Sequence, residues 1–528
     1  MTFRLKKRWR LALGVVATAG LLAWFVWPES RNDLLPPSET PAGLGIPRVY
    51  DDQAMASIEL PLAHPEASPV QISSAYYYRI GVRPIYKSYP IYHPDKEPPG
   101  YIEWLQQQTP ETAFDTADLK TSEDWIEAGE QVFEAPTAYG NMFGFSAGLY
   151  VRDPEWQRAV RPPLLHDGVM PGMRYFVREK GKIEIGMFSC AMCHSRVMPD
   201  GSLVKGAQGN FPFDRALAWD YERLPVLLGP LRSPLARAIE RFLYGAPWLG
   251  PADPSAESDR MSFRDIAAMH RAIPPGVLAR HGTNPLRPSK VPDLIGIKDR
   301  RYLDATGLVQ HREIGDLMRY AAMNQDTDPM ATYLGKSPGA SLPGGETPED
   351  PADVAAGRYS DEQLYALALY IYSLKPPPNP NRFDGLAAAG MEIFERESCA
   401  SCHPPPLYTS NKLTPAKGFT PPAEHLTRYD VLTVSVGTDP DLSLKTRRGT
   451  GYYKAPSLKG VWYRGPFEHN GSVLTLEDWF DPRRLRDDYV PTGFKGYNVK
   501  TRPVPGHPFG LDLTAEEKRS LIAFLKTL

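Results

Sequence analysis

The sequence predicts a mainly α-helical protein with long ordered loops, in which two related halves follow an N-terminal membrane helix and a leading region. Hydrophobic residues make up 42% of the 528 residues and charged residues 23%, a composition typical of packed domains rather than of a disordered chain. Proline, with 55 residues, is present at about twice its usual share and shortens helices and strands. Three short motifs then recur in the same order in both halves.

The charge balance excludes one class of partner. The chain has 60 Lys plus Arg against 62 Asp plus Glu, so its formal net charge is −2. Binding to a polyanion depends on a basic field, which this balance does not provide. We therefore expect no nucleic-acid partner.

Residues 1–28 are predicted to be an N-terminal signal anchor. Five basic residues between Arg4 and Arg10 precede an apolar run from Leu11 to Trp27, which as a helix is about 26 Å long. The basic flank should stay in the cytoplasm and direct the rest of the chain outward. A signal peptide cleaved after Ala19 is the alternative. Either interpretation predicts the bacterial periplasm, with anchoring to the inner membrane unless the segment is cleaved.

Residues 29–180 form a leading region that is rich in proline and tyrosine and contains no cysteine. Its tyrosines cluster between Tyr76 and Tyr101. A row of tyrosines could relay oxidising equivalents, but packing of aromatic rings between irregular loops is the simpler interpretation. The sequence predicts no site in this region.

The remainder is predicted to be two related domains, residues 181–378 and 379–528. Each contains a Cys-x-x-Cys-His motif, then a Lys-x-Pro-x-Leu-x-Gly segment, then an amphipathic helix that opens on a capping box. The Pro-rich stretch 375–381 should be a stiff extended connection between them. The three motifs lie at residues 190–194, 290–296 and after Ser360 in the first half, and at 399–403, 454–460 and after Thr514 in the second.

The Cys-x-x-Cys-His motif predicts covalent haem attachment. Its two thiols add to the vinyl groups of a haem, and the adjacent imidazole becomes the proximal iron ligand. A redox Cys-x-x-Cys or a zinc site is the alternative, but neither requires a histidine after both pairs. The sequence therefore predicts two cytochrome c-like haem domains in tandem, with two c-type haems. The attachment residues are Cys190, Cys193, Cys399 and Cys402, and the proximal ligands are His194 and His403.

The second iron is predicted to have two histidine ligands. The last methionine of the chain is Met391, so the usual methionine ligand cannot follow His403. His507, in a Gly-bounded loop before the closing helix, is the preferred distal ligand. His469 and Glu468 are the alternatives.

The first iron is predicted to be open or weakly ligated. When Lys290 is aligned with Lys454, Ala305 takes the place of His469, and the position matching His507 is Asp353. Both imidazoles are thus missing from the first half. Other candidate distal ligands remain there: His270, His281, His311, Met261, Met269, Met318 and Met323.

These motifs resemble the bacterial di-haem cytochrome c peroxidase superfamily, which includes the enzyme that matures methylamine dehydrogenase and the di-haem rubber oxygenases. The resemblance rests on the paired Cys-x-x-Cys-His motifs and on Lys454 to Leu458 leading to Pro466 to Ser472, and it covers about residues 180–528. It implies that peroxide or dioxygen reacts at the N-terminal haem while the C-terminal haem carries electrons. It also implies a calcium ion between the domains.

Two departures limit the peroxidase assignment. Glu468 stands where the peroxidases commonly have a methionine ligand, and the long leading region is more similar to the rubber oxygenases. We expect a di-haem oxidoreductase that takes a small-molecule oxidant or substrate and exchanges electrons with a soluble cytochrome c. The alternatives are a rubber oxygenase-like dioxygenase and a non-enzymatic electron carrier. No catalytic residue is assigned; Trp219 and Trp248 are candidate bridges between the haems.

Overall fold

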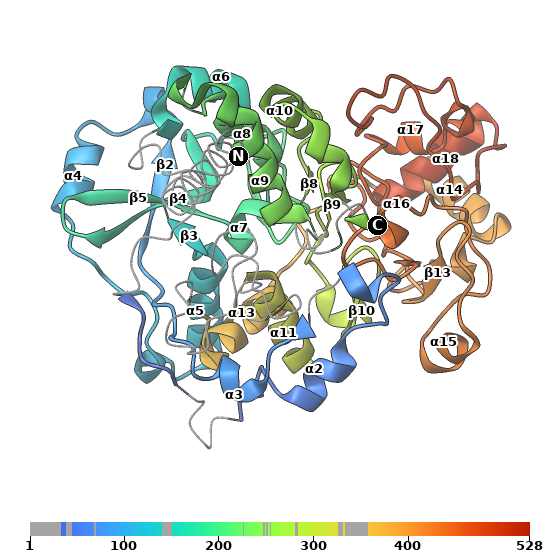
Figure 1. Ribbon diagram of the computed structural model, residues 1–528. Helices are drawn as coiled ribbons and strands as arrows, with labels where there is room; N and C mark the ends of the chain where they lie inside the picture. Colours follow the sequence, from blue (N-terminus) through green and yellow to red (C-terminus); the bar gives the residue numbers. More distant parts are fainter. Residues whose placement is uncertain are drawn as a thin grey trace, which may run out of the picture.

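The computed structural model describes residues 33–38, 45–67, 70–139, 150–224, 226–245, 249, 252–253, 255–279, 283–325, 331–332 and 357–528. The predicted anchor, residues 1–28, lies outside them. Within the described part of the chain, no helix is both long and apolar enough to span a bilayer. In Figure 1 the leading region and first half lie on the left, and the second half lies on the right.

The largest sheet has four antiparallel strands in the order β2-β4-β5-β3, and the sequence analysis did not predict it. Its centre is a hairpin in which Tyr175 lies opposite Ile185. The turn of this hairpin contains Gly181, whose φ of 88° favours glycine. The prediction of a mainly α-helical protein therefore missed this sheet, three of whose four strands belong to the leading region. The strands are β2 (Ser88–Tyr92), β3 (Ala138–Tyr139), β4 (Val169–Glu179) and β5 (Lys182–Met187).

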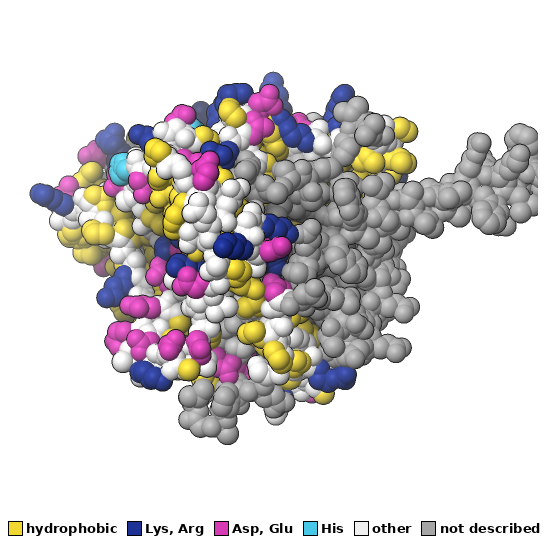
Figure 2. Space-filling view, turned by 90° about the vertical axis from the view of Figure 1, so that its left-hand side faces the viewer, with side chains coloured by type: hydrophobic (Ala, Val, Ile, Leu, Met, Phe, Trp, Pro, Cys, Tyr) yellow, Lys and Arg dark blue, Asp and Glu magenta, His cyan; other side chains and the backbone are white. Residues whose placement is uncertain are grey.

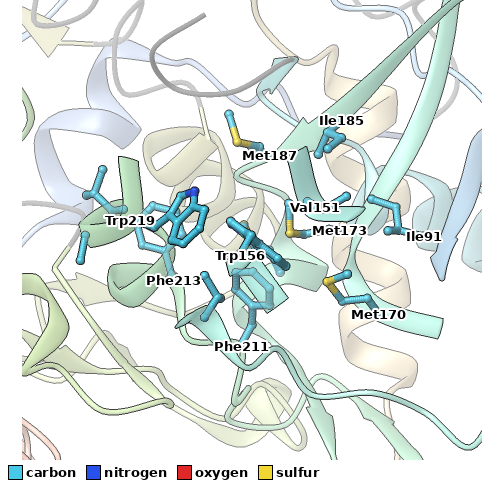
Figure 3. Close-up of a cluster of buried hydrophobic side chains, with 14 of the residues drawn as sticks. Ile91, Val151, Trp156, Met170, Met173, Ile185, Met187, Phe211, Phe213 and Trp219 are labelled. Atoms are coloured by element: carbon cyan, nitrogen blue, oxygen red, sulfur yellow. The ribbon is translucent and has the colours of Figure 1, made fainter. Parts of the chain in front are cut away.

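A large apolar core lies between this sheet and α4 (Tyr101–Gln107) together with four further helices. Met170 and Met173 of β4 pack in it with Trp156 and Phe213, as Figure 3 shows. The core also contains Met192, from the first Cys-x-x-Cys-His motif. This motif is therefore anchored on the sheet and its helices. The four further helices are α6 (Pro154–Val160), α8 (Phe213–Glu222), α9 (Arg232–Tyr244) and α10 (Phe263–Arg271).

Helix α5 (Ser122–Glu134), from the leading region, packs closely against α13 (Asp361–Ser373), the closing helix of the first half. A Cβ added at Gly129 would lie 2.0 Å from the carbonyl oxygen of Ala366, so the two backbones touch. Phe133 lies in the same apolar cluster as the buried face of α13. The predicted domain boundary at residue 181 thus separates two helices that pack together, because α5 falls inside the predicted leading region.

The second half contains a matching pair, α14 (Gly385–Arg396) and α18 (Ala515–Lys526). A Cβ added at Gly390 would lie 1.9 Å from the carbonyl oxygen of Ser520. Phe524 of α18 lies in the apolar cluster beneath. The capping boxes predicted for the two closing helices are confirmed, since side chain and backbone bond reciprocally at the start of both α13 and α18.

Residues 375–381, predicted to connect the two halves, form coil between α13 and α14. The other ladders have two strands each. They are β1 (Val70–Gln71) with β12 (Ala331–Thr332), β6 (Ser195–Val197) with β7 (Leu203–Lys205), β8 (Val277–Leu278) with β9 (Ser289–Lys290), β10 (Tyr302–Leu303) with β11 (Val309–Gln310), and β13 (Leu413–Pro415) with β14 (Tyr452–Lys454). The other helices described are α2 (Asp52–Ile58), α3 (Ser74–Tyr77), α7 (Cys190–Cys193), α11 (Ile314–Gln325), α15 (Ala423–Arg428), α16 (Asp441–Leu444) and α17 (Leu476–Trp479).

The tyrosines of the leading region pack against one another, as the sequence predicted. Tyr50 stacks on Tyr77 with ring centroids 4.6 Å apart, and Tyr92 meets Tyr101 edge to face at 5.2 Å. On the face seen in Figure 2, acidic and basic side chains of the described residues are interspersed with apolar ones. Neither sign of charge dominates this face.

Candidate haem sites

The first Cys-x-x-Cys-His motif begins at α7, directly after the sheet. Ser189 caps this short helix by accepting a hydrogen bond of 3.1 Å from the backbone N–H of Met192. Helix α7 rests on β4, where a Cβ at Gly172 would lie 2.8 Å from the Cα of Met192. The thiols of Cys190 and Cys193 are half-buried. The sheet therefore fixes the position of the motif.

The predicted proximal ligand His194 is oriented by a backbone carbonyl. Its Nδ1–H donates to the carbonyl oxygen of Pro292 at 2.9 Å. A proton on Nδ1 leaves the lone pair of the imidazole on Nε2, the atom that an iron requires. Pro292 belongs to the first Lys-x-Pro-x-Leu-x-Gly segment. This segment therefore sets the tautomer of the proximal histidine.

The second half repeats this arrangement. The motif at Cys399 follows α14, and its histidine, His403, donates from Nδ1 to the carbonyl oxygen of Tyr408 at 3.1 Å. Burial lowers the pKa of His403, while hydrogen bonds to the carbonyls of Tyr408 and Pro456 raise it. Pro456 occupies the same place in its segment as Pro292 does in the first half. The two halves thus differ in detail: His194 bonds the carbonyl of Pro292, whereas His403 bonds that of Tyr408 and has Pro456 only as a weaker neighbour.

His507, the predicted distal ligand, lies beside His403. The centroids of the two imidazole rings are 6.4 Å apart. The loop is held by bonds at both ends of His507: its N–H donates to Val436 at 2.8 Å, and Arg484 donates to its carbonyl at 2.7 Å. His507 has a φ of 46°, so the backbone is forced into the left-handed region to place this ring.

The surroundings of His507 keep its ring neutral. Burial, together with the neighbouring His403, lowers the pKa of His507 to about 4. Its Nδ1 atom is buried without a hydrogen-bond partner among the described residues. Trp479 and Phe509 meet the ring edge to face at 5.3 and 5.2 Å. An uncharged imidazole in an apolar setting is the form that binds a metal ion.

The spacing of His403 and His507 fits an iron held between them. Two metal–imidazole bonds of about 2 Å each, with half of each ring added, span roughly 6 Å between ring centres. The observed centroid distance is 6.4 Å. With the thiols of Cys399 and Cys402 close in sequence, the donor set of this site fits a covalently attached haem with two axial histidines.

The alternative ligands His469 and Glu468 bind each other instead. His469 Nδ1 is 3.2 Å from a carboxylate oxygen of Glu468, and its Nε2 is 3.4 Å from one of Asp439. The two carboxylates overcome the effect of burial and raise the pKa of His469 to about 9. A protonated imidazole has no lone pair to offer an iron. The geometry therefore favours His507 over both.

In the first half, two candidate distal histidines already use both ring nitrogens. His270 is fully buried, 2.7 Å from Asp214 and 2.8 Å from Glu240. These carboxylates raise the pKa of His270 to about 10, against the effect of burial. His311 donates to the carbonyl of Arg300 at 2.7 Å and pairs with the Tyr372 hydroxyl at 2.7 Å. Neither ring is placed to ligate an iron.

Among the described residues, none of the other candidate ligands of the first half is placed beside His194 as His507 is placed beside His403. Met269, Met318 and Met323 are buried in the two large apolar clusters, and Met261 packs at the edge of one of them. Trp219 lies in the cluster of Figure 3 beneath the guanidinium of Arg223. His281, Asp353 and Trp248 lie outside the described residues.

One comparison with known proteins falls on the segment that supports His403. Residues 451–490 match the model of a family described as RoxA-like, cytochrome c-like. Over this range the chain is similar to a cytochrome c-like domain. Proteins of that kind hold haem covalently through Cys-x-x-Cys-His motifs, so the match implies a covalently bound haem. The matched range of the cytochrome c-like domain includes Pro456 and His469 but not the motif at Cys399.

Two further comparisons give one partial sequence relative and one distant solved structure. An uncharacterised protein of Sinorhizobium fredii, y4iJ, is 35% identical over 14% of this chain and 18% of its own length. The chain thus matches less than a fifth of that relative. The hydrazine synthase of Kuenenia stuttgartiensis, in a structure determined under xenon pressure, aligns with 49% of this chain and 79% of its own at 16% identity. Its TM-score of 0.27 is too low to support an inference.

Helix α5, which packs against α13 as α14 packs against α18, was not predicted from the sequence. A signal for it exists, because Gly129 is followed by Val132-Phe133 just as Gly390 is followed by Ile393-Phe394. Among the described residues, no three His, Cys, Asp or Glu side chains are grouped closely enough to hold a further metal ion.

Proposed function

We propose that this protein is a di-haem c-type cytochrome oxidoreductase. One haem would be attached through Cys190 and Cys193 with His194 as proximal ligand. The other would be attached through Cys399 and Cys402, with the axial pair His403 and His507. The observation that carries the proposal is the 6.4 Å spacing of these two imidazoles, one of which follows a Cys-x-x-Cys pair.

The two sites would have different roles because their ligand sets differ. When bound, haem supplies electron transfer at an iron with two strong ligands and reaction with peroxide or dioxygen at an iron with an open position. The carbonyls of Pro292 and Tyr408 orient the proximal imidazoles. His507 closes the second site to substrates, and the apolar core around Met192 shields the first motif from water.

Electron paramagnetic resonance of the oxidised protein tests this division. We expect one low-spin signal from the iron of His403 and one high-spin signal from that of His194. After reduction, carbon monoxide should bind one haem per chain. Two low-spin signals and no carbon monoxide binding would instead identify the rival function, a non-enzymatic carrier with both haems closed.

The second candidate function is an oxygenase of an organic substrate. The leading region, by which the sequence is most similar to the rubber oxygenases, contributes the sheet on which the first Cys-x-x-Cys-His motif rests. Turnover of hydrogen peroxide with reduced cytochrome c, run beside oxygen uptake with polyisoprene, distinguishes peroxidase from oxygenase. Peroxidase activity alone would exclude this candidate.

The cellular setting is part of the same proposal. We expect the protein in the bacterial periplasm, tethered to the inner membrane through residues 1–28 and exchanging electrons with a soluble cytochrome c. Cell fractionation followed by carbonate extraction tests the tether, because a peripheral protein is released and an anchored one is not. The resemblance also leads us to propose a calcium ion between the haem domains, which elemental analysis of the purified protein would detect.

A further inference from the structure

The hairpin of β10 and β11 in the first half has a copy in the second half. In the first hairpin, Leu303 pairs with Val309 in antiparallel register. When the two Lys-x-Pro-x-Leu-x-Gly segments are aligned, these positions correspond to Phe467 and Val473. Phe467 and Val473 form the same antiparallel bridge. The two hairpins therefore share one register.

The turns inside the two hairpins also match position by position. Asp304 and Glu468 are aligned, and both have a left-handed backbone, with φ of 69° and 67°. The aligned glycines Gly307 and Gly471 follow, with φ of 66° and 71°. A left-handed φ is uncommon for a residue other than glycine, so its recurrence at one position indicates the same turn. Asp304 is thus the structural counterpart of Glu468.

Each hairpin contacts the repeated segment of the opposite half. The backbone N–H of Lys290 donates to the carbonyl of His469 at 2.7 Å. The matching N–H of Lys454 donates at 3.2 Å to the carbonyl of Ala305, the residue aligned with His469. A contact that recurs with its two partners exchanged is what an approximate twofold axis produces. Each hairpin therefore stands in the same relation to the Cys-x-x-Cys-His motif of its own half.

In the second half, the hairpin lies on the distal side of the proposed haem. Phe467 and Cys399 pack against the same apolar cluster. The ring centroid of Phe467 is 6.4 Å from that of Trp479, which in turn lies 5.3 Å from that of His507. His507 is the ligand proposed to close this iron. Glu468, the neighbour of Phe467, therefore belongs to the distal wall of the second site.

The twofold relation assigns Asp304 to the distal wall of the first site. The apolar packing supports this assignment, because Leu303, the neighbour of Asp304, lies in a cluster with Ala191. Cys190 packs against the same cluster, as Cys399 does in the other half. The first hairpin thus reaches the motif of the first half.

Asp304 differs from its counterpart in what holds it. Glu468 is 3.2 Å from Nδ1 of His469, whereas Asp304 is followed by Ala305, which has no imidazole. Asp304 accepts a hydrogen bond of 2.6 Å from the backbone N–H of Ala305. Burial raises the pKa of Asp304, although this N–H and the charge of Lys454 lower it. Burial therefore favours the neutral carboxyl group, which has an O–H to donate.

We propose that Asp304 lines the open position of the first haem and donates a hydrogen bond to the small oxidant bound there. This inference rests on the proposed di-haem function and deepens it by naming a side chain that touches the oxidant. A hydrogen-bond donor favours a ligand with lone pairs, such as peroxide, over an apolar organic substrate.

Ligand binding to the intact protein tests the proposal without turnover. Fluoride accepts hydrogen bonds, so Asp304→Leu should weaken fluoride binding to the oxidised high-spin haem roughly tenfold or more. In the reduced protein, the infrared stretch of bound carbon monoxide should move to higher frequency in this variant, because a hydrogen bond to the oxygen weakens the C–O bond. Asp304→Asn keeps an N–H donor and should stay close to the wild type in both measurements.

Matched variants control for general effects. Asp299→Asn removes an exposed carboxylate of the same half and should change neither measurement. Asp304→Ala serves if the leucine variant fails to fold, and it should show the same two shifts. Unchanged fluoride affinity and C–O stretch in the apolar variants overturn the proposal. Tighter fluoride binding overturns it as well, since it would identify a charged carboxylate that repels anions.

The wild-type protein separates this inference from the function on which it rests. If it binds fluoride and carbon monoxide at one haem and the apolar Asp304 variants bind both identically, the role of Asp304 fails and the di-haem function stands. A wild-type protein that binds neither ligand overturns the open first haem and the role of Asp304 together.

Discussion

The two halves of the molecule hold their Cys-x-x-Cys-His motifs in the same frame but differ in what surrounds it. In each, an opening helix crosses a closing helix at a glycine, Gly129 against α13 and Gly390 against α18. In each, a backbone carbonyl accepts a hydrogen bond from Nδ1 of the proximal imidazole, that of Pro292 in the first half and that of Tyr408 in the second. The shared frame orients a proximal ligand and by itself does not determine reactivity.

The differences lie around that frame. In the second half, α14 ends at Arg396 and the motif begins at Cys399. In the first half, strands β3, β4 and β5 of the sheet and helix α6 lie between α5 and Cys190. The second half also has a loop that places His507 opposite His403. The repeated frame with different surroundings is what the proposed difference between the two sites requires.

Removal of each cysteine pair should produce the largest effect. Cys190→Ala/Cys193→Ala and Cys399→Ala/Cys402→Ala should each leave one covalent haem per chain, because thioether attachment needs the thiols of its own half. Intact mass and pyridine haemochrome spectra measure this loss. If one of these double variants still carried two covalent haems, the motif that it removes would not be an attachment site.

Replacing His507 should make the second half resemble the first. His507→Ala removes the imidazole 6.4 Å from His403, so the low-spin signal should give way to a high-spin one and a second carbon monoxide should bind. His469→Gln is the matched control and should keep the low-spin signal, because His469 is paired with Glu468 and Asp439. The opposite pattern would identify His469 as the ligand.

The buried ionic cluster of the first half should make its stability depend on pH. The pKa of His270 rises from 6.5 to about 10 on folding, so its stabilisation is complete below about pH 6.5 and is lost as the pH rises through 10. His270→Gln should lower the free energy of unfolding by about 3 kcal/mol at neutral pH, since two buried carboxylates lose their cation.

Urea denaturation of wild type and His270→Gln between pH 6 and pH 10 measures this effect. The difference between the two proteins should narrow as the pH rises. His311→Gln is the control, because burial lowers the pKa of His311 and its ring bonds a carbonyl and a hydroxyl rather than two carboxylates. A difference that is constant with pH in the His270 variant would show that its ring is uncharged in the folded protein.

The smallest expected effect concerns the helix crossings. Gly390→Ala would place a Cβ 1.9 Å from the Ser520 carbonyl oxygen and should destabilise the second half by about 1–3 kcal/mol. Gly385→Ala, in the same helix but with no atom within 4 Å of the added Cβ, should be neutral or slightly stabilising. Equal urea midpoints for the two variants would mean that the crossing tolerates a wider separation.

The sequence by itself determined the features that depend on neighbouring residues. Three of these features are short-range patterns: the Cys-x-x-Cys-His motifs, the capping boxes of α13 and α18, and the Pro-rich connection between the halves. Each depends on residues only a few positions apart in the chain. The order of the repeated segments could also be found in the sequence, because each copy keeps the same spacing between its residues.

The tertiary structure decided what depends on distant segments. It brought α5 to α13 across more than two hundred residues. It also placed His507 rather than His469 beside His403, and it paired His469 with two carboxylates. Such choices follow from packing and burial, which set the charge of each imidazole and the distance between two side chains. No local spacing encodes them.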